Sequence, residues 1–427
     1  LALEQDVHND VLMDVTYPLT SILGRRPQSV GYAPPAAPPL TLDQAVAAAG
    51  GSAPAADAAR ADIAAAEAGR TIAGLRPNPT VSTEVENIAG TGLYRGLRGA
   101  ETTVGVSIPI ELGGKRSARI AVADARTTRA QLAAAITEAD IRLQVTQLYI
   151  DAVAAERRLT TALDQTRIAN DALNGARVRV RAGRASPIEE QRADVARVNA
   201  EAAAENARRI LESARINLGR RIGQPVVGPL DLAWLDTLSG SYGPQLVPSA
   251  EGALALAAAD ADLAVADAGV RLARSQRIPD VTVGPGVRRF SESNDTAVLF
   301  SISVPIPLFN SGRAAVGQAS AERNRVEAQR RMTRLDVEQA ILDARTEADN
   351  AATLARAANG PALAASQEAA RIARIGYREG KFGQLELLDA ERMLAETRLA
   401  AIDTRAVYQN ARARLERLTA PAPEQGN

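Results

Sequence analysis

The sequence lacks cysteine entirely, contains one histidine, His8, and is only 3% aromatic. The absence of cysteine excludes disulfides, thiol catalysis and zinc–thiolate sites. A single histidine argues against histidine-based acid–base chemistry and against histidine-rich metal binding. We therefore expect no enzymatic activity, no cofactor and no tightly held metal ion.

An excess of charge of one sign is also missing, because 50 basic residues balance 50 acidic ones. Neither nucleic acid nor an anionic membrane surface is therefore indicated as a partner. No run of eighteen apolar residues occurs, so no transmembrane helix is expected. The chain begins at Leu1 without a basic and apolar leader, which indicates a removed signal peptide or a truncated chain.

Two motifs invite a catalytic interpretation and do not support one. Gly113-Gly114-Lys115 is part of a phosphate-loop pattern, but Arg116 stands at the Ser/Thr position and Pro109 at the upstream glycine. Acidic pairs at helical spacing, such as Glu190 and Asp194, are interpreted as solvated helix faces. What is abundant is alanine, which with few aromatics favours long helices packed closely together.

The chain repeats itself with a nearly constant offset. The matching landmarks are Val106–Ile110 with Ile302–Ile306 (offset 196), Gly114-Lys115 with Gly312-Arg313 (198), Arg181–Arg184 with Arg378–Lys381 (197), and Pro77 with Pro279 (202). We therefore predict two structural repeats, 42–222 and 249–419. A Gly- and Pro-rich connector, 223–248, joins them; an N-terminal extension with a Pro-rich linker, 1–41, precedes them; and a tail, 420–427, follows.

Each repeat predicts the same order of elements: helix, strand, strand, long helix, helix. The predicted helices are 42–74, 115–181 and 187–221 in the first repeat, and 250–277, 313–378 and 385–418 in the second. Pro77 and Pro279 are expected to end the first helix of each repeat, and Asn359-Gly360-Pro361 to break or kink the second long helix. The 67 residues of 115–181 would form a helix about 100 Å long, which no ordinary globular domain accommodates.

Four short segments show the alternation of apolar and polar residues that predicts strands. In each segment, alternate residues form one mainly apolar face. The residues of these faces are Val81, Thr83, Val85 and Asn87; Val104, Val106 and Ile108; Val281, Val283 and Val287; and Val298, Phe300, Ile302 and Val304. Their length suits tilted membrane strands. Four strands cannot close a barrel and open edges are not tolerated in lipid, so a membrane-spanning chain must oligomerise, and three copies would supply twelve strands. Two soluble hairpins at the end of a helical rod remain an alternative.

Two motifs carry a resemblance to a known family. Gly376-Tyr377-Arg378-Glu379-Gly380 followed by Leu385–Ala390 resembles the helix-hairpin tip of TolC-type outer membrane factors. Ser303–Phe309 followed by Gly312-Arg313 resembles their strand-to-helix passage. Ile108–Arg116 is similar to the branch that serves heavy-metal cation exporters of the Czc type.

This resemblance implies a mainly α fold with a membrane β-barrel portion: a homotrimer with a twelve-stranded barrel in outer membrane lipid and a long α-helical tunnel in the periplasm of a Gram-negative bacterium. It implies a passive efflux duct for heavy-metal cations. The implied partners are a periplasmic adaptor and a proton-driven inner membrane pump of the RND type. A multidrug duct of the same family and a soluble periplasmic coiled-coil adaptor are the alternatives.

The resemblance also implies site residues. Glu386 and Asp389 match the acidic positions of the tunnel aperture, although Asp389 could instead pair with Arg392 on its own helix. The first repeat has Glu189 and Arg192 at these positions, so its hairpin is expected to contribute less. The tip residues expected to contact the adaptor are Arg181, Gly183, Arg184, Tyr377, Gly380, Lys381 and Phe382. Phe382 stands where some members carry a basic residue that ties protomers together, so that closed-state contact is not expected here.

Overall fold

The computed structural model describes residues 38–238 and 250–423. The predicted extension 1–41 therefore lies almost wholly outside the described residues, as do part of the connector and the end of the tail. Within the described residues, no helix has the length and apolarity needed to cross a membrane.

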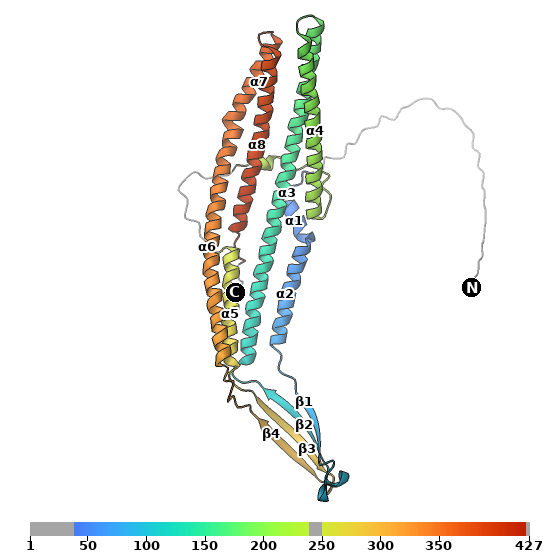
Figure 1. Ribbon diagram of the computed structural model, residues 1–427, viewed down its shortest axis with the longest axis vertical. Helices are drawn as coiled ribbons and strands as arrows, with labels where there is room; N and C mark the ends of the chain where they lie inside the picture. Colours follow the sequence, from blue (N-terminus) through green and yellow to red (C-terminus); the bar gives the residue numbers. More distant parts are fainter. Residues whose placement is uncertain (1–37, 239–249, 424–427) are drawn as a thin grey trace, which may run out of the picture. The chain divides into compact units, whose positions relative to one another are not determined.

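The first repeat contains four α-helices and two strands (Figure 1). They are α1 (Leu42–Ser52), α2 (Pro54–Ala73), β1 (Thr80–Glu86), β2 (Glu101–Ile110), α3 (Lys115–Arg181) and α4 (Pro187–Ile222). The prediction of one helix over 42–74 was wrong, because Ala53 leaves the helical conformation and Pro54 starts a new helix at its first position. The long helix α3 has the predicted bounds.

The second repeat has α5 (Leu254–Ser275), β3 (Val281–Phe290), β4 (Thr296–Ser303), α6 (Arg313–Ala357), α7 (Leu363–Arg378) and α8 (Gln384–Leu418). A π-helical turn, Ala358–Ala362, separates α6 from α7 and contains Pro361. This confirms the predicted interruption, since proline has no N–H to donate and the wider turn accommodates its ring. The prolines Pro77 and Pro279 do not themselves end helices: α2 and α5 end four residues earlier.

The four strands form one antiparallel sheet in the order β1-β2-β3-β4. The register places Val81 opposite Val106, Val104 opposite Val287, and Val283 opposite Ile302. Directly paired residues share a face, so the predicted apolar positions of all four strands form one continuous apolar face. Asn87 and Val304 lie just outside the strands, and Asn87 has a positive φ of 57°.

The polar face of the same sheet carries charged groups that satisfy one another. Arg288 on β3 forms ion pairs with Glu86 on β1 (2.9 Å) and with Glu101 on β2 (2.7 Å). Several side chains of the apolar face are exposed, including Val81 at 73%, Val298 at 84% and Phe300 at 68%. A sheet with one exposed apolar face and one polar face is suited to separating lipid from water.

Helices and strands follow the same lateral order. Figure 1 shows α6, α5, α3 and α2 side by side, and these neighbours are in contact in that order. The strands below them run β4, β3, β2, β1. The described part of the chain therefore has two lateral edges, one made by β4 and α6 and the other by β1 and α2.

The main apolar core lies where α1, α3, α4 and the connector meet. Tyr149 on α3 is fully buried there, and its ring lies edge-on to Trp234 with the centroids 5.5 Å apart. The Tyr149 hydroxyl donates to the Leu40 carbonyl (2.8 Å) and accepts from the Asp231 N–H (3.2 Å). The described part of the connector, which ends at residue 238, is therefore fixed to the core and includes a 3-10 turn, Ala233–Asp236.

Candidate functional site: the helical hairpin tips

The turn between α7 and α8 is built around two glycines. Gly380 has a φ of 74°, a left-handed conformation that costs glycine least. The N–H groups of Lys381 and Phe382 both donate to the Gly376 carbonyl, at 2.8 and 3.2 Å, which closes the end of α7. The Phe382 ring lies directly over Gly376: a Cβ placed there would be 2.1 Å from its Cδ2 atom. The Gly-x-x-x-Gly spacing of the motif thus has a steric cause.

The turn between α3 and α4 has the same construction without the aromatic cover. Gly183 has a φ of 68°, and the Arg184 N–H donates to the Arg179 carbonyl (2.9 Å). Arg181, Gly183 and Arg184 are exposed, as are Gly380, Lys381 and Phe382 of the other turn. Lys381 is paired with Glu379 (2.6 Å). The predicted adaptor-contact residues therefore lie in two accessible turns, with Tyr377 half-buried beside them.

Two contacts connect the α3–α4 hairpin to the α7–α8 hairpin near these turns. The Arg179 guanidinium carbon lies 4.8 Å from the centre of the Tyr377 ring, a cation–π contact. Gln384, 5% exposed, donates from its side-chain nitrogen to the Glu189 carbonyl (2.8 Å). The sequence did not identify Arg179 or Gln384, because their importance depends on a contact between residues about 195 positions apart.

The two predicted aperture carboxylates are exposed on the first turns of α8. Glu386 and Asp389 are three residues apart and so share a helix face. Asp389 lies 3.5 Å from Arg392, and Arg392 lies 3.6 Å from Glu396. The alternative pairing of Asp389 with Arg392 therefore occurs within the chain, but both side chains are more than half exposed, so this pair is weak.

An ion pair with one buried partner, between α7 and α8, was not predicted. Arg374 on α7 binds both carboxylate oxygens of Glu391 on α8, the second at 2.7 Å, and the Glu391 side chain is 6% exposed. The ion pair raises the pKa of Arg374, chiefly through its hydrogen bond to Glu391. The available signal was the position of Glu391 between the buried Leu387 and Leu394 on one helix face. This pair holds the hairpin together below its tip.

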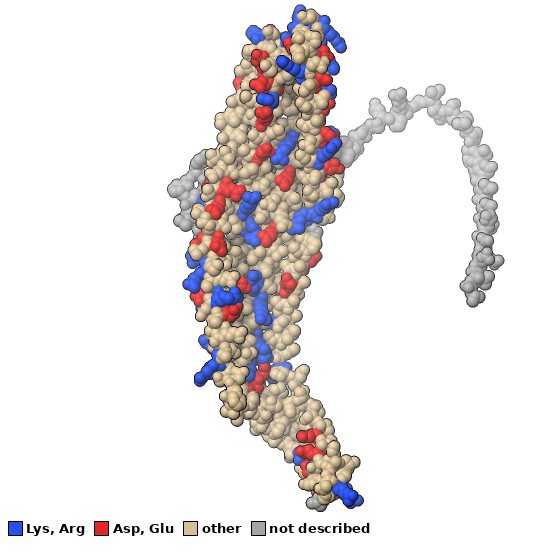
Figure 2. All heavy atoms as spheres, in the orientation of Figure 1, with Lys and Arg blue, Asp and Glu red and all other residues tan. Residues whose placement is uncertain are grey.

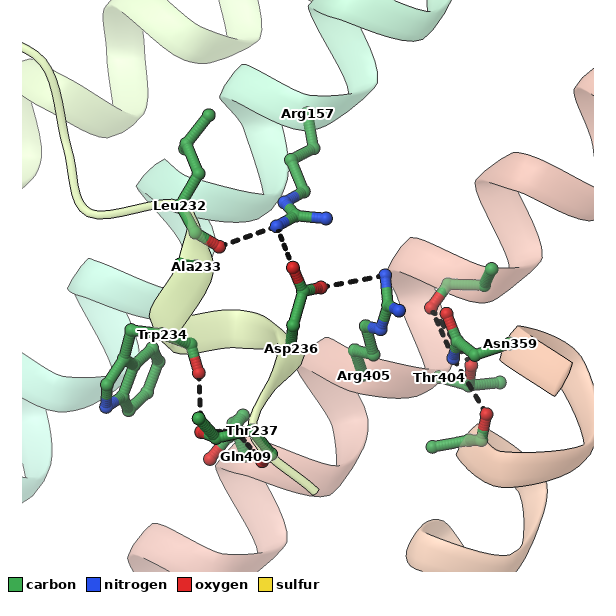
Figure 3. A network of polar contacts seen from close by, with 12 residues as sticks. Arg157, Leu232, Ala233, Trp234, Asp236, Thr237, Asn359, Thr404, Arg405 and Gln409 are labelled. Atoms are coloured by element: carbon green, nitrogen blue, oxygen red, sulfur yellow. Dashed lines mark hydrogen bonds and ion pairs between the residues drawn. The ribbon is translucent and has the colours of Figure 1, made fainter.

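A polar network at mid-length joins α3, the connector and α8 (Figure 3). Asp236 lies between two arginines, Arg157 on α3 (2.5 Å) and Arg405 on α8 (2.9 Å). Arg157 also donates to the Leu232 carbonyl (2.7 Å). Burial lowers the pKa of Arg405, with Asp236 acting in the opposite direction. One connector carboxylate thus ties the two hairpins together.

Further ion pairs between α3 and α8 lie on either side of this network: Arg158 with Asp403 (2.6 Å), Asp164 with Arg398 (2.8 Å) and Asp140 with Arg417 (2.5 Å). Figure 2 shows charged side chains of both signs dispersed over the helices, whereas most of the sheet in that view carries none. Within the described residues, no group of three or more His, Asp or Glu side chains could hold a metal ion.

The structure thus combines a four-stranded sheet with paired helical hairpins, as do channels of the outer membrane. The chain belongs to the outer membrane efflux protein family, whose model matches residues 47–224 and 249–420. It is an outer membrane component of an efflux system, a transport duct and not an enzyme.

Curated relatives and solved structures agree with this assignment. The chain is 31% identical to the cobalt-zinc-cadmium resistance protein CzcC of Cupriavidus metallidurans, over 85% of this chain and 86% of that protein. It is 32% identical to the nickel and cobalt resistance protein CnrC of the same species, over 71% and 72%. A solved structure of CusC has a TM-score of 0.72 at 16% identity, covering 89% of this chain and 92% of the other, which shows a shared fold.

Proposed function

We propose that three copies of this chain form a passive export duct for heavy-metal cations. The single observation that carries the architecture is the four-stranded sheet, which has one apolar face and, among the described residues, no strand paired to its outer edges β1 and β4. Open edges are unstable in lipid, and closing them requires further copies. Three sheets of four strands give a twelve-stranded barrel, continued by the helices as a tunnel into the periplasm.

Support for a metal cargo comes from the relatives. CzcC is named for resistance to cobalt, zinc and cadmium, and CnrC for resistance to nickel and cobalt. Expression of this chain with its matched pump and adaptor, in a strain without its own outer membrane channel, should restore growth on cobalt, zinc or cadmium salts. Restored growth on antibiotics, with none on the metals, would instead favour a multidrug duct.

The energy for transport would come from a proton-driven inner membrane pump of the RND type, reached through a periplasmic adaptor. The exposed turns at Arg181–Arg184 and Tyr377–Phe382 are the proposed adaptor contacts. In support, both turns are exposed, and each is closed by backbone hydrogen bonds to the last turn of its first helix, which reduces the ordering that docking would require.

Glu386 and Asp389 are proposed to line the tunnel aperture, as two rings of three carboxylates each. Such rings concentrate cations and repel anions. The double variant Glu386→Ala/Asp389→Ala should lower the cation-over-anion permeability ratio several-fold in single-channel recordings. Glu416→Ala, which removes an exposed carboxylate near the other end of α8 and on the opposite face from Asp389, is the matched control and should leave the ratio unchanged. An unaltered ratio in the double variant would remove these residues from the aperture.

Opening is proposed to require outward movement of the helices around Tyr377–Asp389. The Arg179–Tyr377 contact opposes this movement within the protomer, and contacts of this kind contribute about 0.5–1 kcal/mol at exposed sites. Arg179→Ala should therefore increase the fraction of time that single channels spend in the open state. Arg181→Ala, which removes a neighbouring exposed arginine, serves as control. Equal behaviour of the two variants would contradict a role for this contact in gating.

A further inference from the structure

Two consecutive arginines on β3 lie on opposite faces of the sheet. Arg288 belongs to the polar face and is neutralised there by Glu86 (2.9 Å) and Glu101 (2.7 Å). Side chains alternate along a strand, so Arg289 belongs to the apolar face. It is the only charged residue that the four described strands place on that face. Since the proposed duct turns the apolar face to lipid, Arg289 has no place in the path of the cargo.

The Arg289 side chain is exposed, and its charge is not neutralised by the chain. Its Nη2 atom donates to the Asn294 side-chain oxygen at 2.6 Å. Asn294 lies in the β3–β4 turn with a φ of 61°. No carboxylate in the described part of the chain forms an ion pair with Arg289. One neutral partner therefore holds the guanidinium in place and leaves its charge for an anion from outside.

Threonines flank Arg289 on both neighbouring strands. Thr102 on β2 and Thr296 on β4 are its direct partners in the register. Directly opposed side chains share a face, with Cβ atoms about 4.5–5.5 Å apart. The surface around Arg289 therefore offers a guanidinium fork and two hydroxyl groups. This set of donors is suited to a phosphate group, whose oxygens accept two parallel hydrogen bonds from arginine.

The β1–β2 loop adds two more arginines at the same end of the sheet. Arg95 and Arg98 are exposed, and neither forms an ion pair with any residue that the structure describes. The loop is joined to the β3–β4 turn by the Ser291 N–H, which donates to the Ala100 carbonyl at 2.9 Å. Figure 2 shows charged side chains at this loop end of the sheet and none over its middle. A second segment thus adds positive charge to the end of the sheet that carries Arg289.

The position of Arg289 along β3 fits the boundary of a membrane. Arg289 is eight residues from Val281, which begins the strand on the side of the helices. That is about 26 Å along the strand, or about 20 Å across a membrane at the usual tilt. The exposed Val304 and Ile306 continue the apolar surface toward the helices. The apolar band of outer membrane barrels is about 25 Å tall, so Arg289 lies at the outer margin of such a band.

The helices of this outer membrane duct extend into the periplasm, so the loop end of the sheet lies at the outer leaflet. That leaflet consists largely of lipopolysaccharide, whose lipid A carries phosphate groups. We propose that Arg289, with Thr102 and Thr296, binds a lipid A phosphate, while the acyl chains lie along the exposed Val298 and Phe300. The arginines of the β1–β2 loop strengthen the attraction. The proposal rests on the proposed membrane barrel and gives the trimer three such sites.

Lipid binding to the purified protein tests the proposal. Native mass spectrometry of the trimer in detergent, titrated with diphosphorylated lipid A, should show up to three bound lipids. Arg289→Gln should raise the apparent Kd for lipid A by about 10-fold, because a hydrogen bond to a charged group is lost. Arg289→Lys, which keeps the charge, should raise it less. Dephosphorylated lipid A should bind the unmodified protein as weakly as diphosphorylated lipid A binds Arg289→Gln.

Two control variants separate this site from general surface charge. Arg331 is exposed and lies 18 residues beyond the start of α6, about 27 Å along the helix. Arg331→Gln should therefore leave the affinity for lipid A unchanged. Glu292→Gln removes an exposed carboxylate from the β3–β4 turn, and because it removes negative charge it should not weaken binding.

The outcomes distinguish this proposal from the proposed duct. An unchanged affinity for lipid A in a trimeric Arg289→Gln variant would overturn the lipid site and leave the duct standing. Equal binding of dephosphorylated lipid A by the unmodified protein would also overturn it, as would tighter binding of phosphatidylglycerol than of lipid A. A water-soluble monomer would overturn both proposals.

Discussion

Replacing Tyr149 with alanine should lower the free energy of unfolding by about 3–5 kcal/mol, as for other buried aromatic side chains. The side chain is fully buried against Trp234, and its hydroxyl joins α3 to Leu40 and to the connector at Asp231. Its loss would leave a cavity and release both segments from the core. Thermal unfolding of the detergent-solubilised protein, followed by helical circular dichroism, would measure the change.

Two further variants separate packing from hydrogen bonding. Tyr149→Phe keeps the ring and leaves the Leu40 carbonyl without its donor, which should cost about 1–3 kcal/mol. Tyr94→Ala, at an exposed tyrosine, should change stability by less than about 0.5 kcal/mol. A loss for Tyr149→Ala no larger than that for Tyr94→Ala would show that the core does not depend on this residue.

The same residue predicts a dependence of stability on alkaline pH. Burial raises the pKa of Tyr149 from 10.0 to about 12. Below pH 10 the phenol is neutral in both the folded and the unfolded state, so its contribution is complete. Between pH 10 and about 12 the unfolded chain ionises first, and stability is lost as the pH rises. Tyr149→Phe should show a shallower decline over this interval than the unmodified protein.

Replacing Gly376 with alanine should disrupt the α7–α8 turn and strongly reduce adaptor binding. The new Cβ would lie 2.1 Å from the Phe382 ring, so the ring must leave its position. Overpacking of this kind costs about 1–3 kcal/mol, enough to displace the turn without unfolding the long helices. Binding of the purified adaptor, measured by biolayer interferometry, should weaken by about 5–100-fold.

A second substitution tests the steric cause. In Gly376→Ala/Phe382→Ala the obstructing ring is absent, and alanine favours the helix more than glycine does. The double variant should therefore bind the adaptor better than Gly376→Ala alone. Phe382→Ala is the matched control, because it shows what the ring itself contributes to binding. No recovery in the double variant would mean that Gly376 is required for another reason.

Much of the fold could be predicted from the sequence, because its signals are local and occur twice. The 67 residues of α3 were predicted with their observed bounds, since long helical periodicity and flanking glycines are read directly from the chain. Asn359-Gly360-Pro361 predicted an interruption, but not that it would take the form of a five-residue π-helical turn. The break at Ala53 was missed because alanine-rich flanks concealed the boundary that Pro54 sets.

The candidate site was also predicted only in part. The residues of the two hairpin turns, Arg181–Arg184 and Tyr377–Phe382, were indicated by glycine spacing and by resemblance. The structure places both turns where they are accessible. The contacts behind them were not predictable: Arg374 with Glu391, and Asp236 with Arg157 and Arg405, join residues whose separation in sequence carries no periodic signal.

The sequence by itself determined the duplication, the helices and the alternation of the strands, because these depend on the spacing of side chains along one segment. Only the tertiary structure decided which segments are neighbours. It aligned four separate apolar strand faces into one, buried Tyr149 against the described part of the connector, and placed Asp236 between two hairpins. These outcomes depend on burial and on charge pairing between distant segments. Both contribute to stability only once the chain has packed.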